Sequence, residues 1–454
     1  MLRHFYSASF SVFLALAAPF YFRKMWRRGG WRRGFAERFG FYGSKLSPCK
    51  TRSTLWFHAV SVGEASTCSE LILKLEEKVS NCHIVASTTT TTGMAVLQRK
   101  LPERITKVYY PVDTRSAVKR TLDAAHPSCI ILFEAELWPN FLWEAQAKRI
   151  PIFLVNARIS EKSYQRYKLF SFLFRPIFAG FTGVGCQNDL DAKLLCELGF
   201  PSKSIRSMGN MKFDTAGQGT SSDFDAGKLL QNIGVPSDAP VVVGGSTHEG
   251  EEALLARICQ RLRRRFASLF LILVPRHFER CSAVAKELSK LNVKFVRRTE
   301  AGGMLFKKGE VNCLLVDTTG ELKSFYRVAS IVFVGKSLTA SGGQNPIEPA
   351  GLGKAVIMGP NMQNFRAIAN ELLANGGAVR VKDQEELENT IEALLVDYSR
   401  RRQLGDNALR TVQANLGATQ RTAEFILHAA EMQRLAAGLS DSVSRQSHER
   451  EVEG

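Results

Sequence analysis

The sequence predicts an α/β protein built from two doubly wound domains. Short apolar runs alternate with helical segments from residue 54 to residue 210, and a second series of the same kind starts near Pro240. Strands that alternate with helices form parallel sheets covered on both faces. The length of 454 residues agrees, because single hydrophobic cores rarely grow past about 250–300 residues. Two such halves joined by a polar segment suggest a cleft between the domains.

The composition is that of a globular protein with a strongly basic surface. Apolar residues make up 45% of the chain, and 61 Lys and Arg against 43 Asp and Glu give a net charge of +18. This excess favours an anionic partner, either nucleic acid, anionic lipid or a phosphorylated substrate, although a solvated basic surface has the same composition. The nine cysteines are scattered singly, so neither a disulfide framework nor a zinc site is expected.

Residues 1–33 predict a membrane anchor with a basic flank. No charged residue occurs from Phe5 to Phe22, although this apolar span is slightly shorter than the roughly 20 residues that cross a bilayer. Arginines and lysines interleaved with Trp26 and Trp31 follow, which is typical of a membrane interface with a cytoplasmic positive flank. We therefore expect the rest of the chain in the cytoplasm. The pattern leaves open whether the segment spans the bilayer or lies in one leaflet.

The first domain is expected over residues 34–214. Its predicted strands are Leu55–Val60, His83–Ser87, Lys107–Tyr110, Cys129–Phe133, Ile152–Val155 and Gly183–Cys186. The first strand stops at Ser61, and Glu64 stands where a helix is expected to begin with Ala65. A carboxylate at the carboxyl end of a strand can be a general base, or an anion that the helix dipole favours. On the residues alone we favour the dipole interpretation.

A second pair of carboxylates, Glu134 and Glu136, follows the fourth predicted strand and precedes a Trp-Pro turn. Charges directly after a buried strand are poorly explained by packing. We therefore favour a functional role for this pair.

A segment rich in Gly, Ser and Asp at residues 215–238 predicts a linker. The second domain is expected over residues 239–436, and residues 437–454 are expected to form a polar tail. The predicted strands of the second domain are Val241–Val243, Leu269–Val274, Cys313–Val316, Ile331–Val334 and Ala355–Met358.

Four polar clusters follow strands of the second domain and predict a nucleotide site. The clusters are Gly244 to Glu252; Pro275, Arg276 and His277; Thr319, Gly320 and Glu321; and Asn345, Pro346, Ile347 and Glu348. An arginine offers forked donors to phosphate or carboxylate, and a glutamate at a helix start can accept both hydroxyls of a ribose. Each cluster alone is explained by turn chemistry, but their joint occurrence at one sheet edge is not.

Two kinds of motif are missing from the sequence, and their absence argues against two classes of reaction. No G-x-x-x-x-G-K-[ST] string occurs, which argues against a P-loop ATPase. No His and Cys cluster has metal-ligand spacing, so we expect a reaction without metal and without a cofactor.

The motifs together resemble one family, the 3-deoxy-D-manno-octulosonic acid (Kdo) transferases. The resemblance covers nearly the whole chain and is carried, in order, by W-F-H-A-V-S-V-G-E, E-A-E-L-W-P-N, N-A-R-I-S, G-N-M-K-F-D, G-S-T-H-E-G-E-E, V-P-R-H, G-E-L and G-G-Q-N-P-I-E-P. It implies a GT-B fold with two Rossmann-like domains, an acceptor half and a CMP-Kdo half. It also implies an enzyme of lipopolysaccharide biosynthesis: an inverting, metal-independent glycosyltransferase that moves Kdo to a phosphorylated lipid A precursor (lipid IVA). The implied location is the cytoplasmic face of a bacterial inner membrane, with an anionic membrane surface and no nucleic acid as partner.

Residue by residue, the resemblance implies roles for three side chains of the first domain. Glu64 matches the proton acceptor, and Glu134 and Lys212 match positions that stabilise the transition state. The clusters that begin at Pro275, Thr319 and Asn345 match CMP-binding segments. The chemistry agrees, because an acceptor hydroxyl is a weak nucleophile and needs a base. Cations such as Arg276 and Lys212 would offset charge on the departing CMP, whose single phosphate makes a metal dispensable.

Two positions depart from the pattern of the family. Gln344 stands where many members carry His, and Lys336 replaces a common Gly. The alternatives to Kdo transfer are another GT-B glycosyltransferase, a sugar-nucleotide epimerase, or a non-catalytic basic module that binds membranes.

Overall fold

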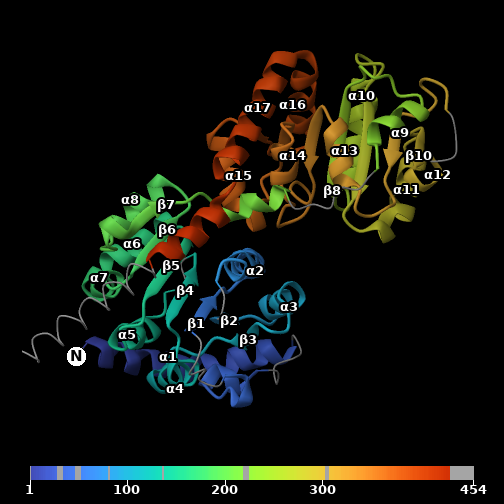
Figure 1. Ribbon diagram of the computed structural model, residues 1–454. Coiled ribbons are helices and arrows are strands. Elements are labelled where there is room, and N and C mark those ends of the chain that lie inside the picture. The colour runs from blue at the N-terminus through green and yellow to red at the C-terminus, as the bar shows by residue number, and fades with distance from the viewer. Residues whose placement is uncertain are drawn as a thin grey trace, which may run out of the picture. The chain divides into compact units, whose positions relative to one another are not determined.

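The computed structural model of the chain describes residues 2–27, 34–46, 53–79, 82–134, 137–217, 224–301 and 306–429 (Figure 1). Internal contacts divide the chain into two units. The first unit comprises Met1–Lys212 with Leu416–Gly454, and the second comprises Phe213–Asn415.

The described part of the first unit holds a parallel sheet in the order β3-β2-β1-β4-β5-β6-β7. The strands are β1 (Ser53–His58), β2 (Cys82–Thr88), β3 (Thr106–Tyr109), β4 (Cys129–Phe133), β5 (Ile152–Ala157), β6 (Gly183–Cys186) and β7 (Ile205–Ser207). Trp56 of β1 lies between Val85 of β2 and Ile130 of β4. Because both faces are covered, the inner strands are continuous apolar runs instead of alternating ones.

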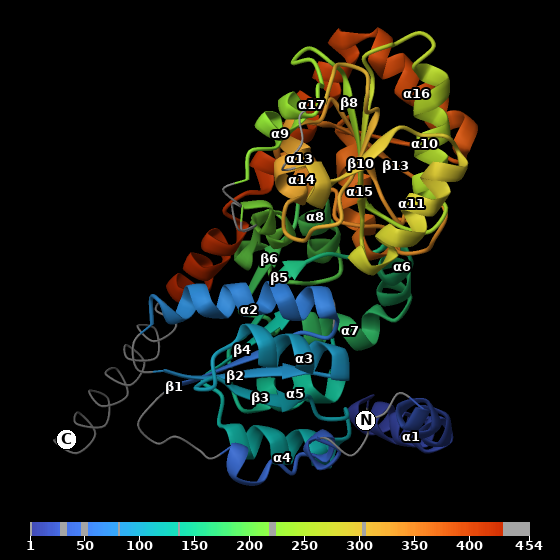
Figure 2. The same ribbon diagram turned by 90° about the vertical axis from the view of Figure 1, so that its right-hand side faces the viewer.

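Successive residues of each strand point to opposite faces of this sheet, and each face has its own core. Trp56 packs with residues of α4, α5, α7 and α8, whereas Phe57 packs with residues of α2, α3 and the segment 418–429. Figure 2 shows α2 and α3 along the strands. The helical segments are α2 (Val62–Glu76), α3 (Thr91–Lys100), α4 (Arg115–Ala125), α5 (Pro139–Ala147), α6 (Glu161–Leu169), α7 (Ser171–Phe178), α8 (Asp189–Glu197), η1 (Ala36–Phe39), η2 (Gly43–Lys45), η3 (Ser202–Ser204) and η4 (Met211–Gly217).

The N-terminal helix α1 (Leu2–Arg27) lies against α5. Its Tyr6 hydroxyl donates to Asp113 at 3.0 Å, and its Ser7 hydroxyl donates to Asn140 at 2.8 Å. The Tyr6 ring also meets Trp143 edge-on, with 5.7 Å between ring centroids. Within the described residues, no helix combines the length and apolarity that crossing a membrane requires.

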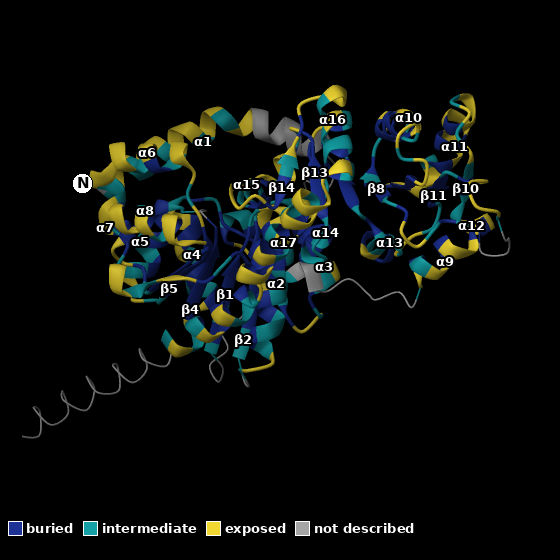
Figure 3. Cartoon of the chain, turned by 90° about the horizontal axis from the view of Figure 1, so that it is seen from above, coloured by how far each residue is buried: buried dark blue, intermediate teal, exposed yellow. Residues whose placement is uncertain are grey.

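The second unit repeats the architecture, with the sheet order β10-β11-β9-β8-β12-β13-β14 among the described residues. Its strands are β8 (Val241–Thr247), β9 (Phe270–Pro275), β10 (Phe295–Arg297), β11 (Cys313–Leu315), β12 (Ile331–Val334), β13 (Ala355–Met358) and β14 (Ala378–Arg380). Its helical segments are α9 (Ala226–Asn232), α10 (Glu251–Leu262), η5 (Phe278–Arg280), α11 (Cys281–Lys290), α12 (Arg298–Ala301), α13 (Leu322–Val328), α14 (Ile347–Gly351), η6 (Gln363–Phe365), α15 (Arg366–Ala374), α16 (Gln384–Val396) and α17 (Tyr398–Asn415). Figure 3 shows the strands of both sheets as the buried parts of their units.

Two boundaries differ from those predicted. The expected linker at residues 215–238 contains α9, whose Leu229 and Leu230 pack in the core of the second unit, and residues 218–223 lie outside the described part. The chain after Asn415 returns to the first unit, where Ala423 and Ile426 pack against the first sheet. The second domain therefore ends before residue 436, and the predicted tail at 437–454 lies outside the described residues.

Candidate active site

Both sheets have a topological switch point, where the chain order along the sheet reverses. In the first sheet the chain runs outward through β1, β2 and β3 and then returns to β4 on the other side of β1. In the second sheet β8 and β12 have the same relation. Ligands of open α/β sheets bind outside the carboxyl ends of the strands at such points. The residues that follow β1, β4, β8 and β12 are therefore the first place to look for a site.

Glu64 follows β1 and belongs to the first turn of α2. The helix begins at Val62, three residues earlier than the predicted start at Ala65, because Ser61 caps it and accepts a hydrogen bond from Glu64 N at 3.2 Å. Glu64 Oε2 in turn accepts from Val60 N at 3.0 Å. This resembles a capping box, in which a serine and a glutamate three residues later satisfy exposed backbone N–H groups. Glu64 thus has a structural role at the N-terminus of α2, as favoured on the residues alone.

The other carboxylate oxygen of Glu64 is available for chemistry. Within the described part of the chain, Glu64 Oε1 accepts no hydrogen bond, and the residue retains 9% of its exposure. Burial raises the pKa of Glu64, and the charge of Glu134 raises it further. The Val60 N–H, the Ser61 hydroxyl and the Lys212 cation oppose this shift, but the pKa stays above its ordinary value. A more basic carboxylate with one unused oxygen is what a general base needs.

Glu134 follows β4 and is held by two cations. Its backbone is left-handed, with φ of 57°, which costs a non-glycine residue roughly 1–2 kcal/mol. Its Oε1 pairs with Lys212 Nζ, and its Oε2 accepts from Arg158 Nε at 3.1 Å. The structure therefore brings the predicted residues Glu64, Glu134 and Lys212 together at one switch point. Glu136 lies outside the described residues.

Lys212 is positioned by asparagines of two elements. Asn156 lies where the β5–β6 register shifts, with φ of 50°, and its Oδ1 accepts from Met211 N at 3.1 Å. Asn210 Oδ1 accepts from Lys212 N at 3.1 Å. Such irregularities in a strand commonly aim side chains at a site. Here they fix the backbone that carries the Lys212 cation.

Glu251 joins the loops that follow β8 and β12. It is fully buried, and its carboxylate accepts backbone N–H groups of His248 at 2.9 Å, Lys336 at 2.8 Å and Ser337 at 3.1 Å. Leu338 N donates to the same carboxylate at 3.2 Å. A carboxylate that accepts several N–H groups fixes their loops strongly. Glu251 thus sets the positions of His248 and Lys336 at the second switch point.

Four predicted residues of the second unit lie around this point. Arg276 and His277 follow β9, and the rings of His277 and His248 are 5.9 Å apart. Asn345 Nδ2 donates to Glu348 Oε1 at 3.3 Å. Burial raises the pKa of Glu348, while Asn345, Lys323 and Arg276 lower it, which places the Arg276 cation near this carboxylate. The geometry suits a ligand that carries both hydroxyls and an anion.

The remaining predicted residues have other surroundings. Glu321 forms a bidentate ion pair with Arg298, at 2.9 and 3.1 Å, and also accepts from Thr318. Thr319 is exposed, and Gly320 is exposed with a left-handed backbone. The buried members are Pro275 in β9, Pro346 at the start of α14, and Ile347, whose side chain packs in the core. For Ile347, only backbone atoms could face a ligand.

Three residues to which the sequence analysis gave no individual role belong to these sites. Arg158 pairs with Glu134, His248 faces His277, and Glu251 anchors two loops. Arg158 directly follows β5, so the rule that singled out Glu134, a charge right after a buried strand, would have found it. The role of Glu251 could not be predicted, because three of the four backbone N–H groups that it binds lie 85–87 residues away.

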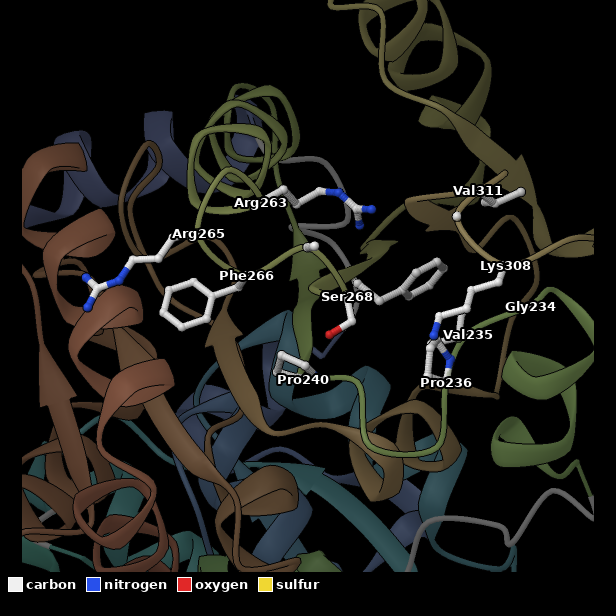
Figure 4. A pocket seen from close by; sticks show the side chains of 13 residues that line it. Gly234, Val235, Pro236, Pro240, Arg263, Arg265, Phe266, Ser268, Lys308 and Val311 are labelled. Atoms are coloured by element: carbon white, nitrogen blue, oxygen red, sulfur yellow. The ribbon is translucent and has the colours of Figure 1, made fainter.

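A cavity of about 480 Å³ lies at the opposite edge of the second sheet, where β8 and β9 begin (Figure 4). Pro236, Pro240, Arg263, Ser268 and Lys308 are among the described residues that line it. None of the predicted site residues is among them. As for metals, no group of three or more His, Cys, Asp or Glu side chains within the described ranges could hold an ion.

Comparisons with known proteins agree on one family. Residues 33–215 match the family model described as 3-deoxy-D-manno-octulosonic-acid transferase (kdotransferase). The chain is 30% identical to the 3-deoxy-D-manno-octulosonic acid transferase of Haemophilus influenzae, covering 87% of this chain and 91% of the relative. It is 31% identical to the protein of the same name from Bordetella pertussis, covering 90% and 96%.

A solved structure of another enzyme shares the fold. This is the UDP-GlcNAc 2-epimerase from Neisseria meningitidis bound to UDP-GlcNAc, at 13% identity and a TM-score of 0.52. The match covers 83% of this chain and 100% of that one. At this identity the likeness concerns the fold alone.

Proposed function

This chain belongs to the 3-deoxy-D-manno-octulosonic acid (Kdo) transferase family, and from that premise we propose that it moves Kdo from CMP-Kdo to a phosphorylated lipid A precursor. The proposed reaction is a single, inverting displacement on the GT-B fold that needs neither a metal nor a cofactor. The observation that carries it is the Glu64 carboxylate: it is mostly buried, has a raised pKa and has one oxygen unused within the described residues.

In the proposed mechanism Glu64 takes the proton of the acceptor hydroxyl. The hydroxyl oxygen forms a bond to the anomeric carbon of Kdo as the bond from that carbon to the phosphate oxygen breaks, and CMP leaves. The raised pKa makes Glu64 a stronger base than an exposed glutamate. Glu134 keeps the pKa of Glu64 high while its own charge is offset by Lys212 and Arg158.

For the donor we propose a site at the switch point of the second sheet. Arg276 would bind the phosphate and offset the charge that develops on it as CMP departs. Glu348, steadied by Asn345, would accept hydroxyls of the ribose. Glu251 supports this site by fixing the loops after β8 and β12.

We also propose that α1 attaches the enzyme to an anionic membrane. Tyr6, Ser7 and Phe10 face the first unit. Other apolar side chains of the helix are open: Phe5 is 75% exposed, Val12 60%, Phe13 59% and Leu16 78%. Exposed apolar side chains next to a basic segment are typical of a helix that contacts a membrane surface. The proposed location is the cytoplasmic face of a bacterial inner membrane.

The direct test is a transfer assay read by mass spectrometry. Purified protein is incubated with CMP-Kdo and tetra-acylated lipid A precursor, with and without EDTA. We expect the acceptor mass to rise by whole Kdo residues at the same rate in both. A parallel incubation with UDP-GlcNAc alone tests the epimerase alternative. If the acceptor stays unmodified, Kdo transfer is refuted, and loss of activity in EDTA would refute the metal-free mechanism.

A further inference from the structure

Lys336 occupies a backbone conformation that a lysine does not favour. Its φ is 57°, in the left-handed region where a glycine would be free of strain. The conformation is imposed from both sides, because Lys336 N donates to Glu251 at 2.8 Å and Lys336 O accepts from Gly343 N at 2.9 Å. Lysine at this position therefore lowers stability relative to glycine, and a compensating role is to be sought in its side chain.

The side chain of Lys336 has no partner within the described part of the protein. Its ammonium makes no ion pair and no hydrogen bond there, although the residue is only partly exposed. The nearby carboxylates are engaged elsewhere: Glu251 by backbone N–H groups, and Glu252 by Arg280 at 2.8 Å and Thr247 at 3.0 Å. Neither carboxylate forms an ion pair with the Lys336 ammonium in the described part of the chain.

The surroundings add more positive charge. Burial lowers the pKa of His248, and the charges of Lys336, His277, Arg280 and Arg276 lower it further, so these groups share one electrostatic environment. The Lys336 side chain runs beside Gly342, where an added Cβ would lie 3.6 Å from Lys336 Cε. These cations repel one another, although Glu252 pairs with Arg280, and a bound anion would reduce the repulsion that is left.

We propose that the Lys336 ammonium binds an anionic oxygen of the donor at the carboxyl end of β12. This rests on the proposed function, since the donor of that reaction carries two suitable groups, the phosphate of CMP and the carboxylate of Kdo. The shared chemistry is a charge-assisted hydrogen bond from the ammonium to an oxyanion. Lys336 then raises the affinity for the donor, and its strained backbone conformation is the cost in stability.

The experiment compares wild type with Lys336→Gly in the full-length protein. Glycine relieves the left-handed strain, so we expect the Tm to rise by about 2–4 °C while donor affinity falls. A purely structural role would move both in the same direction. Lys308→Ala is the matched control, because it removes one lysine from the same unit, at the opposite edge of the sheet (Figure 4). It should leave donor binding unchanged.

Three ligands identify the oxyanion. If Lys336 binds the phosphate, Lys336→Gly weakens CMP about tenfold in calorimetric titration and leaves cytidine unchanged, which is the loss of about one charged hydrogen bond. If it binds the carboxylate, CMP binding is unchanged and the KM for CMP-Kdo rises about tenfold. Both results support the proposal.

Two results overturn it. Equal affinity of wild type and Lys336→Gly for CMP and for CMP-Kdo refutes the contact while leaving Kdo transfer intact. An equal weakening of cytidine shows a general disturbance of the site and also refutes it. Wild-type protein that neither binds CMP nor transfers Kdo refutes the proposed function itself, and the inference with it.

Discussion

Replacing Glu64 by glutamine separates its two roles. The glutamine side chain keeps an oxygen that can accept from Val60 N, and glutamine serves in capping boxes as glutamate does, so α2 should keep its start. The neutral amide cannot take a proton. We therefore expect Glu64→Gln to fold normally and to lose about 10²–10⁴-fold in kcat, the usual contribution of a general base. That corresponds to a barrier higher by about 3–5 kcal/mol.

The stability of this variant gives an independent check. The pKa of Glu64 is raised in the folded protein, so its ionised form is disfavoured by folding. Such a group lowers stability progressively as pH rises from the unfolded pKa through the folded one. At pH 7.5 the variant escapes this penalty but loses about 1 kcal/mol because its hydrogen bond to Val60 N is weaker, so we expect its stability to lie within about 1 kcal/mol of wild type.

The assay is the initial rate of CMP release with saturating donor and acceptor, alongside thermal unfolding. The control is Glu76→Gln, which changes the same charge on the same helix but breaks only an exposed ion pair with Arg104, and should keep the wild-type rate. A Glu64→Gln protein that turns over at the wild-type rate would refute the base assignment. A large drop in the Tm of Glu64→Gln would show that the main role of Glu64 is to cap α2 and not to act in catalysis.

Three further predictions follow from the same geometry. The pH profile of kcat/KM should rise tenfold per unit and level off at the pKa of Glu64, above 4.5, and the midpoint should move to lower pH in Glu134→Gln, which removes a charge that raises this pKa; an unmoved midpoint contradicts the coupling. In a co-sedimentation assay with anionic vesicles, the double variant Phe13→Asp with Leu16→Asp should stay in the supernatant, whereas wild type sediments with the vesicles. Val396→Asp, at an exposed apolar position of the second unit, should sediment like wild type. Glu251→Ala should lose roughly 2–4 kcal/mol of its free energy of unfolding and bind CMP more weakly, because several backbone N–H groups lose their acceptor; an unaffected CMP affinity contradicts its positioning role.

The inner strands of both sheets follow from the sequence alone. Runs such as Cys129–Phe133 and Ile331–Val334 coincide with β4 and β12, because strands buried on both faces must be apolar throughout. The strands not predicted are β7, β10 and β14, which have three residues each and lie at sheet edges. Short edge strands bury little and pair on one side only, so they leave a weak pattern.

The domain boundaries depended on contacts that no local pattern encodes. The segment 215–238 has a linker composition, yet Leu229, Leu230 and Ile233 give α9 an apolar side that the second unit buries. The sequence predicts a helical stretch that continues past Asn415, and its pattern does not indicate which unit the later part covers. Which unit it covers is decided by the open face of the first sheet, where Ala423 and Ile426 fit.

The sequence predicted which residues form the candidate site but not the contacts between them. A search for charged residues directly after predicted strands identified Glu64, Glu134 and the Arg276 cluster. It works because parallel strands bring their carboxyl ends to one edge of the sheet. The ion pairs that hold Glu134, and the left-handed backbone of Glu134 and Lys336, arise from loops far apart in the chain. Only the structure shows that Glu64 caps a helix and keeps one oxygen for chemistry.

The configuration of the product tests the central claim most directly. If Glu64 deprotonates the acceptor hydroxyl for a single attack on the anomeric carbon, the Kdo residue in the product must have the opposite anomeric configuration to that in CMP-Kdo. NMR of the purified product, made by the wild-type enzyme in the presence of EDTA, reads this configuration. We predict inversion. Net retention would exclude a single attack from the face opposite the leaving group, and it would contradict the role assigned to Glu64.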